Sequence, residues 1–293
     1  MLRSRWLQFA LACALVTAPG LACAQTASTP PTTQATTSFQ ANDSSQTISL
    51  DSFTPDVTPE QFAKLMSSTN RIGGGYLVEP TYPGGNGLRS LPLPDIDYTY
   101  KKRFFINMED GAGVYLYNDG TFSFATSAFF RLGRDQTNSP KILGLGNIAE
   151  APQARFISEY DLGWLDLKGS LVHDFSGSYG TTFEAKIGTA LPVTNRFVVV
   201  PAFTTVVADH SYMQAWYGVS EFQSLATGKP VFNAHAGVES VGTTVDALYR
   251  FAPNLALIGR GGMSYLVSNV AHSPVIERRF QPTFGFGLSY LFQ

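Results

Sequence analysis

The nine residues before Gln293 alternate between large apolar and mostly small side chains. The large set is Phe284, Phe286, Leu288, Tyr290 and Phe292, and the residues between them are Gly285, Gly287, Ser289 and Leu291. A period of two predicts a β-strand with two different faces. Because one face is aromatic and apolar along its whole length, and a secretory signal precedes it in the chain, we expect that face to meet lipid.

Residues 1–24 have the pattern of a secretory signal peptide. Arg3 and Arg5 form a basic start, residues 6–16 form a short apolar run, and residues 22–24 form a small-residue cleavage site. An uncleaved anchor is disfavoured because the apolar run is too short to span a bilayer. A lipid attached to Cys23 is disfavoured because Gly20 lies three residues before it.

The composition of the remaining chain fits a protein that crosses a membrane as strands. Both cysteines, Cys13 and Cys23, lie in the signal peptide, so the exported chain has no disulfide. Charged residues make up 14% of the sequence and aromatic residues 13%. After the signal peptide, no apolar run reaches 18 residues, which predicts no membrane helix. A formal charge of −2 excludes a typical nucleic-acid binder.

Three further segments follow the signal peptide. Residues 25–57 are rich in Ser, Thr, Gln and Pro and are predicted to be a disordered periplasmic linker. Residues 58–70 are predicted to contain a short helix, which ends at about Ser67, and a lead-in to the barrel. Thr58 is its N-cap, Pro59 takes the first position and Gln61 completes a capping box. Residues 71–293 are predicted to be a β-barrel domain.

The barrel domain contains about twelve segments that alternate with period two. Turn signals such as Asn118-Asp119-Gly120 separate them. The third and fourth segments are short and could form one bent strand, which leaves ten strands as an alternative. The segments are 71–79, 88–100, 103–109, 112–118, 120–133, 153–164, 166–176, 180–191, 195–208, 239–251, 254–268 and 279–292.

The alternation places charged residues opposite the apolar face. The charges that share the non-lipid face are Glu159, Asp161, Glu184, Lys186, Asp246, Arg250 and Arg260. A soluble β-sandwich would show the same period, with its charges in water. The signal peptide and the aromatic last strand favour an all-β, transmembrane, antiparallel up-and-down β-barrel, in which these charges face the lumen. They either line a pore or fill the lumen with ion pairs; a twelve-stranded barrel favours a filled lumen.

Segment 88–100 departs from this alternation. Leu91 and Leu93 have odd numbers, whereas Ile96, Tyr98 and Tyr100 have even numbers. Pro92 and Pro94 lie at the change. A β-bulge at the prolines would move the apolar face from one parity to the other.

Several sequence blocks resemble the MipA/OmpV family of outer-membrane proteins. The most specific block is Tyr212-Met213-Gln214-Ala215-Trp216-Tyr217-Gly218-Val219. Others are Gly73-Gly74-Gly75, Pro92-Leu93-Pro94-Asp95-Ile96-Asp97-Tyr98, Phe130-Arg131-Leu132-Gly133-Arg134-Asp135 and Ser273-Pro274-Val275. The resemblance covers about residues 71–293. It departs at Gln293, which follows the terminal aromatic residue and could slow recognition by the barrel-assembly machinery.

The resemblance implies an integral outer-membrane barrel without enzymatic activity. One family member is described as a scaffold that joins a lytic transglycosylase to a murein synthase, and others as adhesins or porin-like proteins. We therefore expect a scaffold for murein enzymes, with a narrow porin or an adhesin as the alternatives. Neither the family nor the sequence specifies the oligomeric state.

The sequence offers no catalytic, cofactor-binding or metal-binding constellation. The four histidines, His173, His210, His235 and His272, have no partners at a spacing typical of catalysis or metal binding. The longest connection, residues 209–238, contains Tyr212, Trp216 and Tyr217. By the count of strands it lies outside the cell, where its aromatic residues either bind a partner or form a lid over the barrel mouth.

Overall fold

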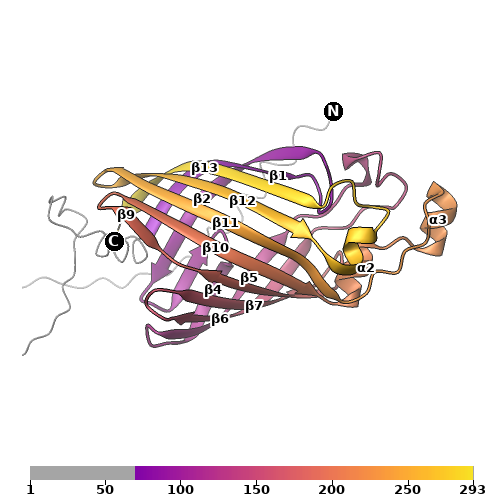
Figure 1. The fold of residues 1–293 in the computed structure, drawn as a ribbon. Helices are drawn as coiled ribbons and strands as arrows, with labels where there is room; N and C mark the ends of the chain where they lie inside the picture. Colours follow the sequence, from indigo (N-terminus) through magenta and orange to yellow (C-terminus); the bar gives the residue numbers. More distant parts are fainter. Residues whose placement is uncertain (1–69, 293) are drawn as a thin grey trace, which may run out of the picture. The chain divides into compact units, whose positions relative to one another are not determined.

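The computed structural model describes residues 70–292. The predicted signal peptide, linker and short helix lie outside these residues, as does Gln293. Asn70, the last residue of the predicted lead-in, begins the first strand. The described part of the chain forms thirteen strands (Figure 1).

Twelve of the strands form the barrel wall. They are β1 (Asn70–Pro80), β2 (Leu88–Tyr100), β3 (Phe104–Asn107), β4 (Gly111–Asn118), β5 (Phe122–Arg131), β6 (Ala151–Asp161), β7 (Asp166–Asp174), β8 (Thr181–Gly188), β10 (Phe197–Ala208), β11 (Gly237–Ala252), β12 (Leu255–Leu266) and β13 (Phe280–Phe292). β9 (Leu191–Thr194) pairs with β10 alone among the described strands and extends the β8–β10 connection as a hairpin.

The sheet closes on itself because the last strand pairs with the first. β10 pairs with both β8 and β11, and β13 pairs with β12 and with β1, where Gly75 lies opposite Gly287. All of these pairs are antiparallel. The predicted twelve-stranded antiparallel barrel is therefore confirmed, including the pairing of the last strand with the first. Closure gives each of the twelve wall strands two neighbours along at least part of its length, as in barrels that cross a bilayer.

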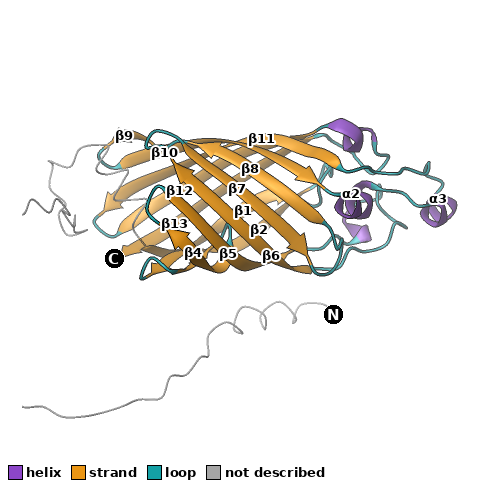
Figure 2. Ribbon diagram, turned by 90° about the horizontal axis from the view of Figure 1, so that it is seen from below, coloured by secondary structure: helices purple, strands orange, loops and turns teal. Residues whose placement is uncertain are grey.

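The two ends of the barrel differ in their connections. Long connections at one end, here called the loop end, cover residues 81–87, 132–150, 175–180, 209–236 and 267–279. Short turns lie at the opposite end, here called the turn end, where β1 begins and β13 finishes. The loop end carries two α-helices, α2 (His210–Tyr217) and α3 (Glu221–Thr227), and two short 3₁₀ helices, η1 (Gln136–Asn138) and η2 (Ser268–His272) (Figure 2). None of the helices in residues 70–292 is long and apolar enough to cross a membrane.

The side chains of the wall differ between its outer and inner faces. Four of the five large side chains of the last strand, Phe284, Phe286, Leu288 and Tyr290, are exposed on the outside, and Phe292 is half-buried. Between them, Ser289 and Leu291 are buried on the inner face. The same sorting holds on β8, where Phe183 and Ile187 are exposed. An outer surface this apolar is expected of a barrel that faces lipid.

Two of the strand predictions were wrong in detail. The segment 180–191 is not one strand, since β8 ends at Gly188 and β9 begins at Leu191. There is also no bulge at Pro92 and Pro94, because the β1–β2 register runs without a shift from Arg71↔Asp97 to Pro80↔Leu88. Parity is kept because Leu91 and Leu93 face inward, opposite Leu77 and Gly75. The lumen is therefore partly apolar. The prediction had placed every apolar face toward lipid and every charged face toward the lumen, so it did not anticipate this.

Candidate functional site

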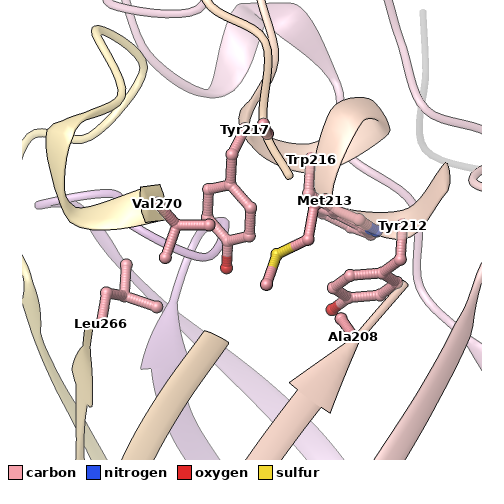
Figure 3. Close-up of a cluster of buried hydrophobic side chains, with 8 residues drawn as sticks. Ala208, Tyr212, Met213, Trp216, Tyr217, Leu266 and Val270 are labelled. Carbon is pink, nitrogen blue, oxygen red and sulfur yellow. The ribbon is translucent and has the colours of Figure 1, made fainter. Parts of the chain in front are cut away.

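The loop end of the barrel is closed by the helix α2. Asp209 caps this helix, and its side chain accepts a hydrogen bond from the Tyr212 N–H at 2.8 Å. One face of the helix buries Tyr212, Met213, Trp216 and Tyr217, and Tyr217 has no exposed surface. Figure 3 shows these side chains with Leu266, the last residue of β12, and Val270, in the last loop. We call this group, with Ala208 and Ala234, the cap cluster.

Polar contacts hold the cap cluster to the wall. The Tyr217 hydroxyl donates to the Glu239 carboxylate on β11, and the Tyr212 hydroxyl lies 3.4 Å from the same carboxylate oxygen. On the other side of the barrel, Arg131 of β5 donates to the Tyr212 hydroxyl at 3.2 Å, and its guanidinium lies 5.0 Å from the centre of that ring. Burial and the nearby Glu239 raise the pKa of both tyrosines well above their usual range, so both hydroxyls stay protonated.

A second apolar cluster joins the other loops above the lumen. Its buried members are Tyr82, Ile142, Leu145, Val219 and Val275, which come from four different connections. The Tyr82 hydroxyl donates to the Val275 carbonyl at 3.2 Å, and burial together with Glu277 raises the pKa of Tyr82 to about 12. Because this cluster and the cap cluster share Phe232 as a packing partner, the loops form one continuous cover.

Beyond this cover, helix α3 carries the most exposed apolar side chains of the loop end. Phe222 is 80% exposed and Leu225 is 88% exposed. Ser220 and Gln223 form a capping box that fixes the start of this helix. The three aromatic residues named from the sequence as loop candidates, Tyr212, Trp216 and Tyr217, are thus inside the cover, and the exposed apolar groups of the loop are others.

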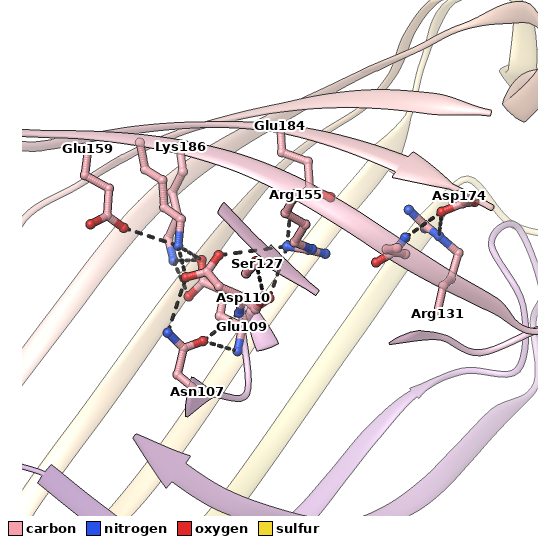
Figure 4. Close-up of polar contacts among 12 residues, drawn as sticks. Asn107, Glu109, Asp110, Ser127, Arg131, Arg155, Glu159, Asp174, Glu184 and Lys186 are labelled. Atoms are coloured by element: carbon pink, nitrogen blue, oxygen red, sulfur yellow. Dashed lines mark hydrogen bonds and ion pairs between the residues drawn. The ribbon is translucent and has the colours of Figure 1, made fainter. Parts of the chain in front are cut away.

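The lumen below the cap contains a network of ion pairs centred on the turn between β3 and β4. Glu109 and Asp110 in this turn reach the opposite wall (Figure 4). The Lys168 ammonium on β7 lies 2.7 Å from an Asp110 carboxylate oxygen and 3.3 Å from one of Glu109. Lys186 on β8 lies 3.0 Å from Glu109. The turn therefore bridges the lumen from one side to the other.

Arg155 on β6 extends this network toward the loop end. Its side chain is almost fully buried, lies 3.9 Å from the carboxylates of Asp110 and Glu184, and donates to the Glu109 carbonyl at 3.1 Å. The guanidinium also lies 5.1 Å from the centre of the Phe129 ring. A buried charge with several partners of this kind cross-links the wall rather than lining an open pore.

Further ion pairs lie on the other strands. Arg260 on β12 pairs with Asp246 on β11, with an Nη2–Oδ2 distance of 2.9 Å. Arg71 on β1 lies 3.1 Å from Asp95 and 3.0 Å from Asp97, both on β2. These pairs join neighbouring strands, whereas the pairs of the β3–β4 turn join opposite walls.

The structure places the charges named from the sequence as follows. Lys186, Glu184 and Glu159 belong to the network of the turn, and Glu159 lies 3.5 Å from Lys168. Asp246 and Arg260 pair with each other. Asp161 lies at the turn end, where it accepts a hydrogen bond from the Gly163 N–H at 2.6 Å, and Arg250 is buried and donates to the Pro253 carbonyl at 3.0 Å.

Sequence reasoning missed several residues that organise the lumen and the cap. Glu109 and Asp110 were assigned to strand ends or turns, although the run Asn107-Met108-Glu109-Asp110-Gly111 carries a turn signal with two adjacent acids. Arg155 and Glu239 were not singled out because each is one charge in an otherwise regular strand. The helices α2 and α3 could have been found from the N-cap residues Asp209 and Ser220.

The lumen keeps free space between the ion pairs. A cavity of about 490 Å³ has an apolar wall formed by Leu77, Leu93, Val198, Val200, Leu248 and Ile258. The lining also includes the charged side chains of Glu109, Lys168, Lys186 and Arg260. A second cavity, of about 410 Å³, lies against Glu159 and Asp161. Within residues 70–292, no group of three or more His, Cys, Asp or Glu side chains is arranged to hold a metal ion.

Comparison with known proteins gives a family match over nearly all of the described chain. A family model described as "MltA-interacting protein MipA" matches residues 72–292. An Escherichia coli strain K12 relative, "Putative outer membrane protein YiaT", is 28% identical over 131 residues, which cover 44% of this chain and 52% of the relative. The relative of the same description from Escherichia coli O157:H7 gives the same values. This chain therefore spans about half the length of these curated relatives.

Solved structures of barrels give weaker likenesses. The KdgM porin in complex with disordered oligogalacturonate has a TM-score of 0.42 and 10% identity, covering 76% of this chain and 99% of that chain. The NanC porin has a TM-score of 0.43 and 10% identity, covering 75% of this chain and 98% of that chain. Likenesses of this size carry no argument about the function of this chain.

Proposed function

Because this chain belongs to the family of MltA-interacting proteins, MipA, we propose that it is a scaffold that holds murein enzymes at the inner face of the outer membrane. The protein is an integral barrel of that membrane. In the proposal, a lytic transglycosylase and a murein synthase bind its periplasmic side, and the barrel itself catalyses no reaction.

The observation that carries this proposal is the closed loop end. The cap cluster and the second apolar cluster fill the mouth, and the ion pairs of the β3–β4 turn cross the lumen below it. A barrel filled in this way provides anchorage in the membrane rather than a wide path through it. Its free surfaces for a protein partner are then the exposed ends.

The periplasmic surface is the turn end, since outer-membrane barrels have short periplasmic turns and longer extracellular loops. Two features of this end fit a docking surface. Trp164 is 73% exposed in the β6–β7 turn, and Leu191 and Val193 are exposed on β9, in the connection from β8 to β10. Thr189, which precedes that hairpin, donates to the Trp164 carbonyl at 2.6 Å, so the two features are joined. Exposed aromatic and aliphatic side chains of this kind act as anchors in protein interfaces.

The proposal is tested by co-purification from envelope extracts. The chain is compared with a form lacking residues 25–69 and with Trp164→Glu and Val193→Glu variants. We expect the complete chain to recover a lytic transglycosylase and a murein synthase, and the charged substitutions to reduce recovery at least several-fold. Leu225→Glu at the loop end is the matched control and should recover both enzymes as the unchanged chain does. Recovery of neither enzyme by any form contradicts the scaffold.

A narrow channel is the second candidate, and the free space in the lumen is the observation that favours it. The two cavities have charged walls of both signs, as a path for small polar solutes would have. The channel requires the loop cover to move, because the buried aromatic residues of α2 lie across the mouth. If liposomes that contain this barrel swell in small sugars or amino acids, and liposomes without it do not, the channel is favoured over the scaffold.

A further inference from the structure

The barrel wall has a gap between β2 and β5. β2 pairs along its whole length with β1, but with β3 only from Asp97 to Tyr100. The β3–β4 hairpin ends at that height, and β4 reaches β5 no higher than the Ala112↔Ala128 pair. Among the described residues, no strand pairs with the free edge of β2 from residue 88 to residue 96. At a rise of about 3.3 Å per residue, this free edge is about 30 Å long.

The hairpin is short because the sequence ends it in the middle of the wall. The Asn107 side chain accepts hydrogen bonds from the N–H groups of Glu109 at 3.0 Å and Asp110 at 2.6 Å. Gly111 then has a φ of +83°, which favours glycine. Because Glu109 and Asp110 are held by lysines on the opposite wall, the turn bends into the lumen and away from the gap. The residues of this turn therefore determine where the gap begins.

The free edge of β2 carries proline at two of its central positions. Proline has no N–H, yet the β1–β2 ladder continues past Pro92 and Pro94 without a shift. The N–H groups that bond to β1 must therefore be those of Leu91, Leu93 and Asp95. Pro92 and Pro94 lie between them, on the side of β2 that faces the gap, and have no N–H to offer there. Ser90 and Ile96 keep N–H groups on the same edge, so the prolines remove the donors only at its centre. An edge interrupted by proline in this way is a poor partner for an added strand. The gap is thus unsuited to a β-strand of a partner.

In a barrel that spans the membrane, the outer side of this gap is turned toward lipid. Unpaired N–H groups in hydrocarbon are strongly unfavourable, and Pro92 and Pro94 lower their number at the centre of the edge. Behind the edge lies the cavity of about 490 Å³, whose lining includes Leu93, Pro94 and Met108. Its apolar wall continues from Leu93 and Leu77 to Val198, Leu248 and Ile258. A volume of this size is typical of sites that hold small organic molecules.

We propose that the gap is a lateral window through which the acyl chain of a membrane lipid enters this cavity. The acyl chain lies against the apolar part of the lining, and the ion pairs of Glu109, Lys168 and Lys186 form the polar part of the same lining. The loop cover closes the loop end above the cavity, and the window connects the cavity to the bilayer. This inference is independent of the scaffold role and holds whether or not murein enzymes bind.

The window is tested by cross-linking from within the bilayer. Cys13 and Cys23 lie in the predicted signal peptide, so a cysteine introduced after residue 24 is unique. Leu93→Cys, Ser170→Cys and Phe286→Cys variants of the chain from residue 25 are placed in vesicles that contain a phosphatidylcholine with a maleimide at the end of one acyl chain. Phe286 is on the lipid face, and Ser170 is buried on the inner face of β7 between two fully paired strands.

We expect Leu93→Cys to react within ten-fold of the rate of Phe286→Cys, and at least ten-fold faster than Ser170→Cys. A Leu93→Cys rate as low as that of Ser170→Cys overturns the window, because the lipid then does not reach the cavity. A Ser170→Cys rate as high as that of Leu93→Cys also overturns it, because the lipid then enters by another route. Reaction of every variant with a water-soluble maleimide after unfolding shows that each thiol is present.

Discussion

The loop end of the barrel and the lumen below it are closed by opposite kinds of side chain. The cap cluster consists of aromatic and aliphatic groups contributed by α2 and the last loop, with two tyrosine hydroxyls on one carboxylate. The lumen is crossed by ammonium and guanidinium groups on the acids of one turn. Apolar closure depends on shape and excluded water, whereas ionic closure depends on pairing and salt. The two regions should therefore respond to different changes.

The largest effect is expected from Tyr217→Ala in the cap cluster. This change removes a fully buried ring and leaves Glu239 with only the longer contact to the Tyr212 hydroxyl, so we expect the barrel to lose about 4 kcal/mol of unfolding free energy. The change also opens the mouth, and current steps should appear in planar bilayers. Phe222→Ala, on the exposed side of the same loop, is the matched control and should leave the urea unfolding midpoint and the conductance unchanged.

A smaller effect is expected from Lys168→Met in the lumen. This substitution keeps the length of the side chain but leaves the buried Asp110 carboxylate with the distant Arg155 as its one cationic partner, beside a long hydrogen bond from the Asn107 amide. We expect this loss to cost about 3 kcal/mol in urea unfolding. The double variant Lys168→Met, Asp110→Leu should recover most of that loss, because it removes both charges. A double variant less stable than Lys168→Met would show that the pair is not what stabilises the turn.

The cap should also weaken at high pH. The pKa values of Tyr212 and Tyr217 are raised by burial, so the folded state keeps both hydroxyls protonated where the unfolded chain loses its protons. Their contribution is complete below about pH 10, the usual tyrosine pKa, and decreases as the pH rises above it. Unfolding midpoints at pH 8 and pH 11 measure this loss.

Tyr217→Phe separates the hydroxyl from the ring in the same experiment. It should cost about 1.5 kcal/mol at pH 8, the value of a hydrogen bond to a charged group. The difference between the two pH values should then be smaller than in the unchanged protein. An equal pH dependence in both proteins would assign the effect to groups outside the cap cluster.

The smallest effect is expected from salt on the Arg260–Asp246 pair. Both side chains are partly exposed to the lumen, so screening should reduce a contribution of about 0.5 kcal/mol. The stability difference between the unchanged protein and Arg260→Gln, measured at 0.05 M and 1 M salt, should shrink at high salt. The corresponding difference for Tyr217→Ala should not shrink, since apolar closure is not weakened by screening.

The fold could be predicted from the sequence because a barrel wall repeats one simple pattern. Alternation of period two located all twelve strands of the wall and the pairing of β13 with β1. It failed at β2, where Leu91 and Leu93 face an apolar part of the lumen rather than lipid. A pattern that sorts residues only into apolar and polar cannot tell a side chain that faces lipid from one that faces an apolar part of the lumen.

The candidate sites were harder to predict because they depend on contacts between distant segments. Glu109 meets Lys186 only because the barrel curves 77 residues of chain around to it. The burial of Tyr212, Trp216 and Tyr217 depends on how one loop folds against β5, β11 and β12. The window depends on the height at which one hairpin ends, which is a property of strand register and not of composition.

The central claim is that the barrel is closed at its loop end, and single-channel recording tests it most directly. The unchanged protein, inserted in a planar bilayer at 1 M KCl, should give no stable current steps, while Tyr217→Ala should give them at the same protein concentration. Regular steps from the unchanged protein would contradict the closed barrel and would favour the channel over the scaffold.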